Sequence, residues 1–135
     1  MAGYSKRSLV NKLGIKAGQR LYFAHAPDNY NDTLGDLPTD INQVDQLNGP
    51  LDFIQLFTKS RAKLEAEFPG LKQALASDGM LWISWPKKAS KITTDLDENI
   101  VREIGLQNGL VDVKVCAVDD VWSGLKFVYR VKDRG

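Results

Sequence analysis

Three short apolar segments constrain the fold of this chain most strongly. They are QRLYFAHAP (19–27), LDFIQLF (51–57) and MLWISW (80–85), and turn residues border each of them. Short runs with few polar positions are typical of strands that are covered on both faces. Two later segments, LVDVKVCAVD (110–119) and LKFVYRV (125–131), alternate apolar and polar residues. Only DVWSG connects them, which predicts that they are antiparallel neighbours.

Helical patterns separate these predicted strands. In SRAKLEAEFPGLKQALAS (60–77), apolar residues from Leu64 to Leu75 recur at spacings of four, three and four. Pro69 interrupts this pattern, because proline lacks a backbone N–H and clashes with the preceding turn. We therefore expect two short helices or a kink, with Pro69 opening the second helix.

Three further helices are expected. The segment TTDLDENIVREIGLQNG (93–109) has an acidic first turn and pairs Glu98 with Arg102 at a spacing of four residues. A shorter helix should begin at Ser5 as its N-cap and end at Gly14 in the left-handed conformation. The segment DNYNDTLGDLP (28–38) predicts another short helix, stopped by Gly35, and a weak strand INQV (41–44) follows it.

This order of elements predicts an α/β fold with three layers, Rossmann-like, in which a mostly parallel sheet ends in an antiparallel C-terminal hairpin. We expect one domain over residues 1–135, since no repeat or flexible linker interrupts the chain. The link between 41–44 and 51–57 is too short for a parallel crossover. Either these two strands are not neighbours, or the first of them is not a strand.

Composition excludes several classes of protein. Cys116 is the only cysteine, so neither an internal disulfide nor a multi-cysteine zinc site is available. No apolar run reaches the roughly 18 residues that span a bilayer, and we expect a cytoplasmic protein without a membrane partner. The formal net charge of +1 makes nucleic acid an unexpected partner, although local patches are left open. Charge is uneven: residues 21–58 carry six carboxylates and no Lys or Arg, whereas residues 59–91 are basic.

A ligand in such a fold should bind at the carboxyl ends of the parallel strands. The turn after the first strand, AHAPDNYN, holds no glycine, and none occurs between Gly18 and Gly35. Glycine lets a backbone approach a nucleotide closely, so the dinucleotide fingerprint and the Walker loop are both missing. We therefore expect no cofactor.

Nine residues near the predicted strand ends are candidates for ligand binding. They are His25, Thr58, Lys59, Ser60, Trp85, Lys87, Lys88, Trp122 and Ser123. Each also has a structural interpretation: a helix cap at 58–60, a packed tryptophan with solvated lysines at 85–88, and a tryptophan plug in the hairpin turn. His25 has no nucleophile motif beside it, so no catalytic residue is assigned, and no metal site is expected.

The segments LVNKLGIKAGQRLYFAHAP (9–27), WPKKAS (85–90) and DVWSGLKFVYR (120–130) resemble a bacterial family that carries a domain-of-unknown-function label. The resemblance covers nearly the whole chain. More distantly, the strand order and the closing hairpin resemble the later part of class I methyltransferases. Where that group has a glycine-rich cofactor turn, this chain has AHAPDNY.

These observations lead us to expect a non-catalytic binding or regulatory module. Its ligand would be a small anion or an acidic protein segment at the carboxyl edge of the sheet. One alternative is a divergent S-adenosylmethionine-dependent methyltransferase that holds its cofactor through side chains. Another is a structural or assembly protein, in which the acidic stretch 28–52 of one copy meets the basic stretch of another in an oligomer.

Overall fold

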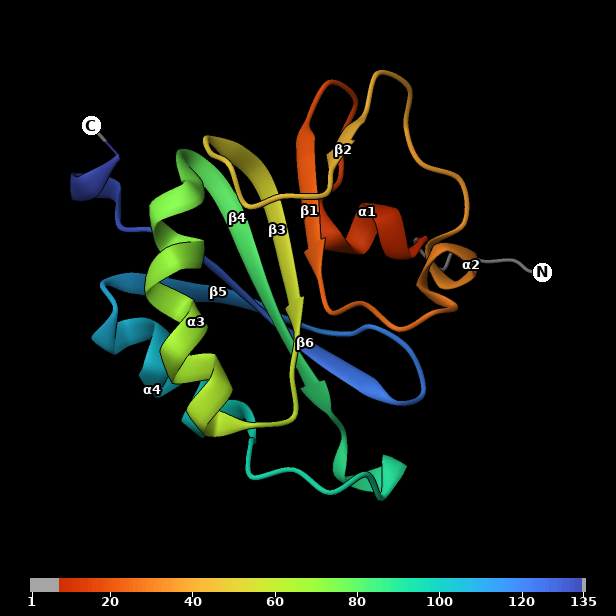
Figure 1. The fold of residues 1–135 in the computed structure, drawn as a ribbon, viewed down its shortest axis with the longest axis vertical. Coiled ribbons are helices and arrows are strands. Elements are labelled where there is room, and N and C mark those ends of the chain that lie inside the picture. Colours follow the sequence, from red (N-terminus) through yellow and green to blue (C-terminus); the bar gives the residue numbers. More distant parts are fainter. Residues whose placement is uncertain (1–7, 135) are drawn as a thin grey trace.

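A computed structural model describes residues 8–134, which form one six-stranded mixed sheet (Figure 1). The strands, in their order across the sheet, are β2 (Asn42–Val44), β1 (Arg20–Ala24), β3 (Leu51–Phe57), β4 (Leu75–Pro86), β6 (Trp122–Tyr129) and β5 (Leu110–Ala117). The first four are mutually parallel, and β6 is antiparallel to both of its neighbours. The predicted α/β fold, with a mostly parallel sheet and an antiparallel C-terminal hairpin, is confirmed.

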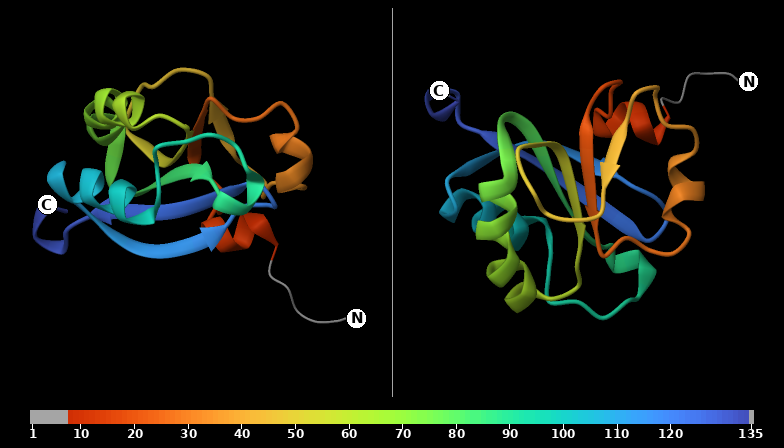
Figure 2. Two further views of the ribbon diagram at one scale, coloured as in Figure 1. Left: turned by 90° about the horizontal axis from the view of Figure 1, so that it is seen from below. Right: turned by 45° about the horizontal axis from the view of Figure 1, so that its top comes forward.

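Helices cover both faces of this sheet, and α1 and α3 lie on opposite sides of it in Figure 2. On one face pack α3 (Arg61–Ala74) and α4 (Glu98–Gln107), with Leu64, Phe68 and Ile104 buried. On the other face pack α1 (Leu9–Leu13) and α2 (Tyr30–Leu34), against the buried Trp82 and Phe53. Two short 3₁₀ turns, η1 (Lys88–Ser90) and η2 (Val131–Asp133), follow β4 and β6.

Side-chain caps define where the helices begin. The Ser8 hydroxyl accepts the Asn11 N–H at 3.2 Å, and the Asp97 carboxylate accepts the Ile100 N–H at 2.8 Å. Gly14 ends α1 with a φ of +86°, as predicted. Ser5, which we predicted as the N-cap of that helix, lies outside the described residues.

Of the two alternatives predicted at Pro69, two short helices or a kink, the first is wrong. A single helix, α3, continues from Arg61 to Ala74 with Pro69 inside it. Pro69 and Glu65 lie on the exposed face, so water can bind the carbonyl that the missing N–H leaves free. The buried contacts of the opposite face hold the helix together across the proline.

Strand β4 is longer than predicted. It starts at Leu75, which we placed on the helix, and it includes Asp78 and Gly79, which are among the turn residues that border the predicted segment 80–85. A Cβ at Gly79 would lie 2.9 Å from the Leu51 carbonyl oxygen, so the close approach of β3 requires glycine here.

The short link between β2 and β3 is explained by their positions. Both strands pair with β1, one on each side of it, and they do not pair with each other. In Figure 1 the segment 45–50 crosses β1 and connects the end of β2 to the start of β3. Of our two interpretations, the first is correct: INQV contains a strand, and the two strands are not neighbours.

Candidate functional site

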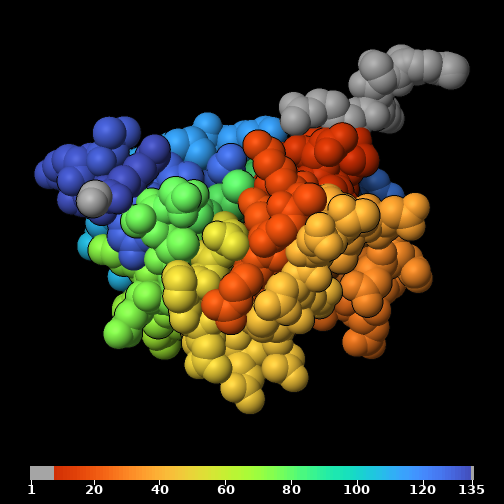
Figure 3. Space-filling view, turned by 90° about the horizontal axis from the view of Figure 1, so that it is seen from above, coloured from red at the N-terminus to blue at the C-terminus, as the bar shows by residue number. Residues whose placement is uncertain are grey.

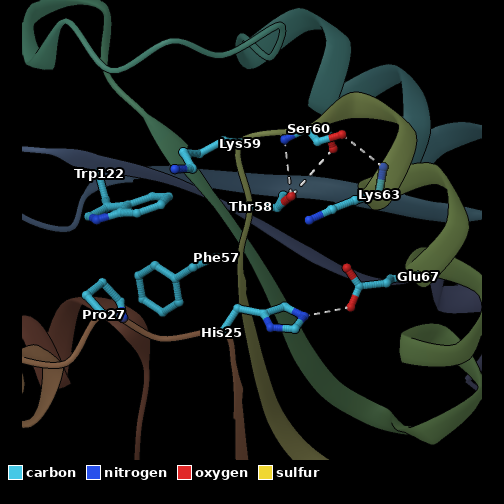
Figure 4. A pocket seen from close by; sticks show the side chains of 9 residues that line it. All are labelled: His25, Pro27, Phe57, Thr58, Lys59, Ser60, Lys63, Glu67 and Trp122. Carbon is cyan, nitrogen blue, oxygen red and sulfur yellow. Dashed lines mark hydrogen bonds and ion pairs between the residues drawn. The ribbon is translucent and has the colours of Figure 1, made fainter.

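A cavity lies at the carboxyl ends of β1 and β3, where the fold predicts a ligand (Figure 4). We call it the β1–β3 cavity, and its volume is about 450 Å³. It is lined by His25, Pro27, Phe57, Thr58, Lys59, Ser60, Lys63, Glu67 and Trp122. A volume of this size is within the range of small-molecule sites.

The wall of this cavity is aromatic on one side and polar on the other. The rings of Phe57 and Trp122 meet edge to face, with centroids 5.2 Å apart. Lys59, from the segment before α3, lies beside Trp122, and Lys63 extends into the cavity from the first turn of α3 (Figure 4). The Ser60 hydroxyl caps that helix by accepting the Lys63 N–H at 3.2 Å. The cavity can therefore hold a planar apolar group beside a negatively charged one.

His25 occupies the turn that follows β1 and has an unusual backbone. Its φ is +58°, in the left-handed region that favours glycine. The ring is turned toward α3, where His25 Nε2 lies 3.0 Å from Glu67 Oε1 (Figure 4). The turn thus has a glycine-like backbone without a glycine.

A second cavity lies on the other side of the same turn. We call it the β1–β2 cavity, and its volume is about 380 Å³. It is lined by Phe23, His25, Ala26, Pro27, Asp28, Tyr30, Asn31 and Gln43. Because His25 and Pro27 line both cavities, the two adjoin at the carboxyl end of β1.

A buried polar chain supports the walls of both cavities. The Tyr30 hydroxyl donates to Gln55 Oε1 at 2.5 Å, and Gln55 Nε2 donates to Ser84 Oγ at 3.0 Å. Burial raises the pKa of the Tyr30 phenol well above its ordinary value, and the hydrogen bond to Gln55 only partly opposes this shift. The Tyr30 ring also contacts Phe57, at a centroid distance of 4.7 Å. Tyr30 therefore links α2 to the aromatic wall of the β1–β3 cavity.

Five of the nine predicted ligand-binding residues line the β1–β3 cavity. They are His25, Thr58, Lys59, Ser60 and Trp122. Trp85 is 6% exposed and packs in the core beneath α3 and α4. Ser123 pairs with Trp85 across β4 and β6. Lys88 lines a different cavity, on the loop before α4, and Lys87 donates its backbone N–H to the Val121 carbonyl at 2.7 Å.

Four residues of this cavity were not predicted: Pro27, Phe57, Lys63 and Glu67. The helical period could have indicated two of them. Lys63 and Glu67 follow the N-cap Ser60 at three and seven residues, and these spacings share one helical face. The approach of Glu67 to His25 across the sheet edge had no signal in the sequence.

In residues 8–134, no group of three or more His, Cys, Asp or Glu side chains comes together in a way that could hold a metal ion. No helix in the described part of the chain has the length and apolarity needed to cross a membrane.

No family profile and no curated protein matches the chain by sequence. Similarity to solved structures is extensive. A structure described as a DhpI–SAH complex has a TM-score of 0.64 at 10% identity, covering 92% of this chain and 83% of that one. The precorrin-6y C5,15-methyltransferase of Geobacter metallireducens has a TM-score of 0.60 at 9% identity, with 90% and 86% covered. The magnesium protoporphyrin IX methyltransferase of Synechocystis with bound SAH has a TM-score of 0.56 at 15% identity, with 90% and 78% covered.

The fold is therefore that of the class I methyltransferases, the more distant of the two resemblances seen in the sequence. Our main functional expectation, a non-catalytic module for a small anion or an acidic segment, is wrong, because these neighbours favour its methyltransferase alternative. The error lay in equating a missing glycine with a missing left-handed turn. His25 adopts that backbone conformation itself.

Proposed function

We propose that this protein is a divergent methyltransferase that binds S-adenosylmethionine across the carboxyl end of β1. The observation that carries the proposal is the pair of adjoining cavities at the His25–Pro27 turn, within a methyltransferase fold. Together they provide an elongated site between the ends of β2 and β3. A nucleoside joined to an amino acid has this elongated form.

The residues that line the two cavities fit the chemical groups of this cofactor. In the β1–β2 cavity, the Asp28 carboxylate can accept hydrogen bonds from ribose hydroxyls, and the amides of Asn31 and Gln43 can pair with a base. In the β1–β3 cavity, Lys59 and Lys63 can hold the carboxylate of the amino acid end. When bound, the cofactor would supply a methyl group activated by its positively charged sulfur.

Side chains of this protein would exclude water from the methyl group and shape the site around it. Phe57 and Trp122 provide an apolar wall that excludes water from one side of the β1–β3 cavity. The contact between Glu67 and the His25 ring keeps that ring on the α3 side of the turn. The cytoplasmic location expected from the sequence suits this activity and stays a prediction.

Isothermal titration calorimetry with S-adenosylmethionine and its demethylated product tests the proposal. We expect saturable binding of both, with Asp28→Asn weakening it about tenfold, as the loss of a hydrogen bond to a charged group predicts. Asp32→Asn makes the same change at a neighbouring exposed residue that lines neither cavity, and should leave binding unchanged. If the folded protein shows no saturable heat at about 1 mM ligand, the proposal is refuted.

A further inference from the structure

A group of lysines gathers on the sheet face that carries α1, away from both cavities. We call Lys12, Lys16, Lys114 and Lys126 the basic face. Lys114 and Lys126 are direct cross-strand partners in the β5–β6 hairpin. Lys114 Nζ donates to the Lys12 carbonyl oxygen at 3.0 Å, which joins the hairpin to the last turn of α1. In Figure 3 the blue strand β5 runs along the upper edge of the view to the red segment of α1.

Among the described residues, none of these lysines forms an ion pair with a carboxylate. Within residues 8–134, every ion pair involves other side chains: His25 or Arg61 with residues of α3, and Arg102 with Glu98 and Asp112. Asp78 lines a small cavity together with Lys126, and no ion pair joins the two. Like charges directly opposite one another destabilise a strand pair, so the arrangement has an energetic cost.

The surroundings of Lys126 disfavour its charge. It is half-buried, and burial followed by the charges of Lys114 and Lys16 lowers the pKa of its ammonium group. An anion bound across the three ammonium groups would remove the repulsion and favour their charged forms. The repulsion between these lysines is thus explained if an anionic ligand covers the basic face when the protein acts.

We propose that the basic face binds the phosphate backbone of a double-stranded nucleic acid. The nearest cavity, beside Lys126 and Arg134, has a volume of only about 160 Å³, below the range of small-molecule sites. A ligand for all four lysines must therefore lie across the surface. The charges come from α1, the turn after it, β5 and β6, so they form a strip and not a pocket.

The chemistry of this strip favours a duplex over other polyanions. Lysine meets phosphate as a point charge and reads no base, and none of the four members of the basic face is aromatic or apolar. Single strands need aromatic stacking platforms, and membrane surfaces are held by Trp, Phe or Leu. A duplex presents only its phosphates. The net charge of +1 gave no indication of this face, because five exposed aspartates between residues 28 and 45 offset the positive charge of the lysines.

Fluorescence anisotropy with a labelled RNA duplex of about 20 base pairs tests this proposal, with the DNA duplex of the same sequence in parallel. We expect both to bind, and the logarithm of the association constant to fall with log salt at a slope of about −3 to −4, as about four phosphate contacts predict. Lys114→Gln combined with Lys126→Gln should weaken binding at least about tenfold at low salt and reduce the slope by about 2. Circular dichroism melting checks that this variant stays folded.

Lys88→Gln combined with Lys91→Gln is the matched control. It removes the same charge from exposed residues of the loop before α4, and it should bind the duplex like the unaltered protein. Equal weakening by the two double variants, or no duplex binding at low salt, overturns the proposal. So does competition by tripolyphosphate or by anionic vesicles at equal phosphate concentration. Cofactor titration of the Lys114/Lys126 variant keeps this test separate from that of the proposed function.

Discussion

Replacing Tyr30 with Phe and Gln55 with Leu should destabilise the protein far less together than the two single changes predict. The reason is the hydrogen-bonded chain from Tyr30 through Gln55 to Ser84. Gln55 and Ser84 are 0% exposed and Tyr30 is 3% exposed, so water cannot replace a lost partner. Each buried group left without a partner costs about 1–3 kcal/mol.

The magnitudes follow from counting the groups that each change leaves unpaired. Tyr30→Phe leaves one, the Gln55 carbonyl oxygen, and should cost about 1.5 kcal/mol of unfolding free energy. Gln55→Leu leaves the hydroxyls of Tyr30 and Ser84, and should cost about 3 kcal/mol. The double variant leaves only the Ser84 hydroxyl and should cost about 1.5 kcal/mol, so the cycle is non-additive by about 3 kcal/mol.

Urea unfolding followed by tryptophan fluorescence and circular dichroism measures these free energies. Tyr22→Phe is the control, because it removes the same hydroxyl from a half-buried ring on β1 and should change stability by less than about 0.5 kcal/mol. Additive costs in the double variant would refute the reasoning, since they would mean that the Tyr30 and Gln55 side chains do not depend on one another.

Two further perturbations test the packing and the electrostatics. Gly105→Ala places a Cβ 2.0 Å from a carbon of the buried Phe127 ring and should cost about 1–3 kcal/mol in urea unfolding, despite alanine's helix preference. Gly70→Ala, whose Cβ meets nothing closer than 3.9 Å on the exposed side of α3, should instead stabilise the protein by about 0.5–1 kcal/mol, and the opposite order of the two would contradict the packing. Because the folded state raises the pKa of Tyr30, its proton is lost first from the unfolded chain. Above about pH 10, the free energy of unfolding from urea titrations should therefore fall faster for the unaltered protein than for Tyr30→Phe, by up to about 1.4 kcal/mol per pH unit. Parallel curves of free energy against pH would contradict the raised pKa.

Local patterns were sufficient for most of the fold. The strand LDFIQLF was predicted with its observed bounds, Leu51–Phe57, because a short apolar run between turn residues is typical of a buried strand. The antiparallel pairing of β5 and β6 followed from alternation and a short link. The alternative of two separate helices failed at Pro69, where packing of the buried helix face outweighs the loss of one hydrogen bond on the exposed face.

The site was less accessible to sequence reasoning, because its members meet through tertiary contacts. Proximity to a strand end selected both Trp85 and Trp122, yet strand pleating turns Trp85 into the core while Trp122 lines the β1–β3 cavity. Glu67 lies 42 residues from His25 in sequence, and only the packing of α3 against the sheet brings the two together. A polar contact between residues so far apart in the chain produces no periodic pattern in the sequence.

The left-handed conformation of His25 and its contact with Glu67 bear jointly on what this turn can bind. A glycine leaves the backbone open on every side, whereas a side chain at the same φ obstructs one side. Glu67 belongs to α3 and draws the ring toward that helix, while α2 and Tyr30 lie on the opposite face of the sheet. The β1–β2 cavity therefore keeps an approach to the turn from the α2 side that the ring does not fill. A residue with a side chain can serve where glycine is usual, provided that a partner outside the turn fixes the direction in which that side chain points.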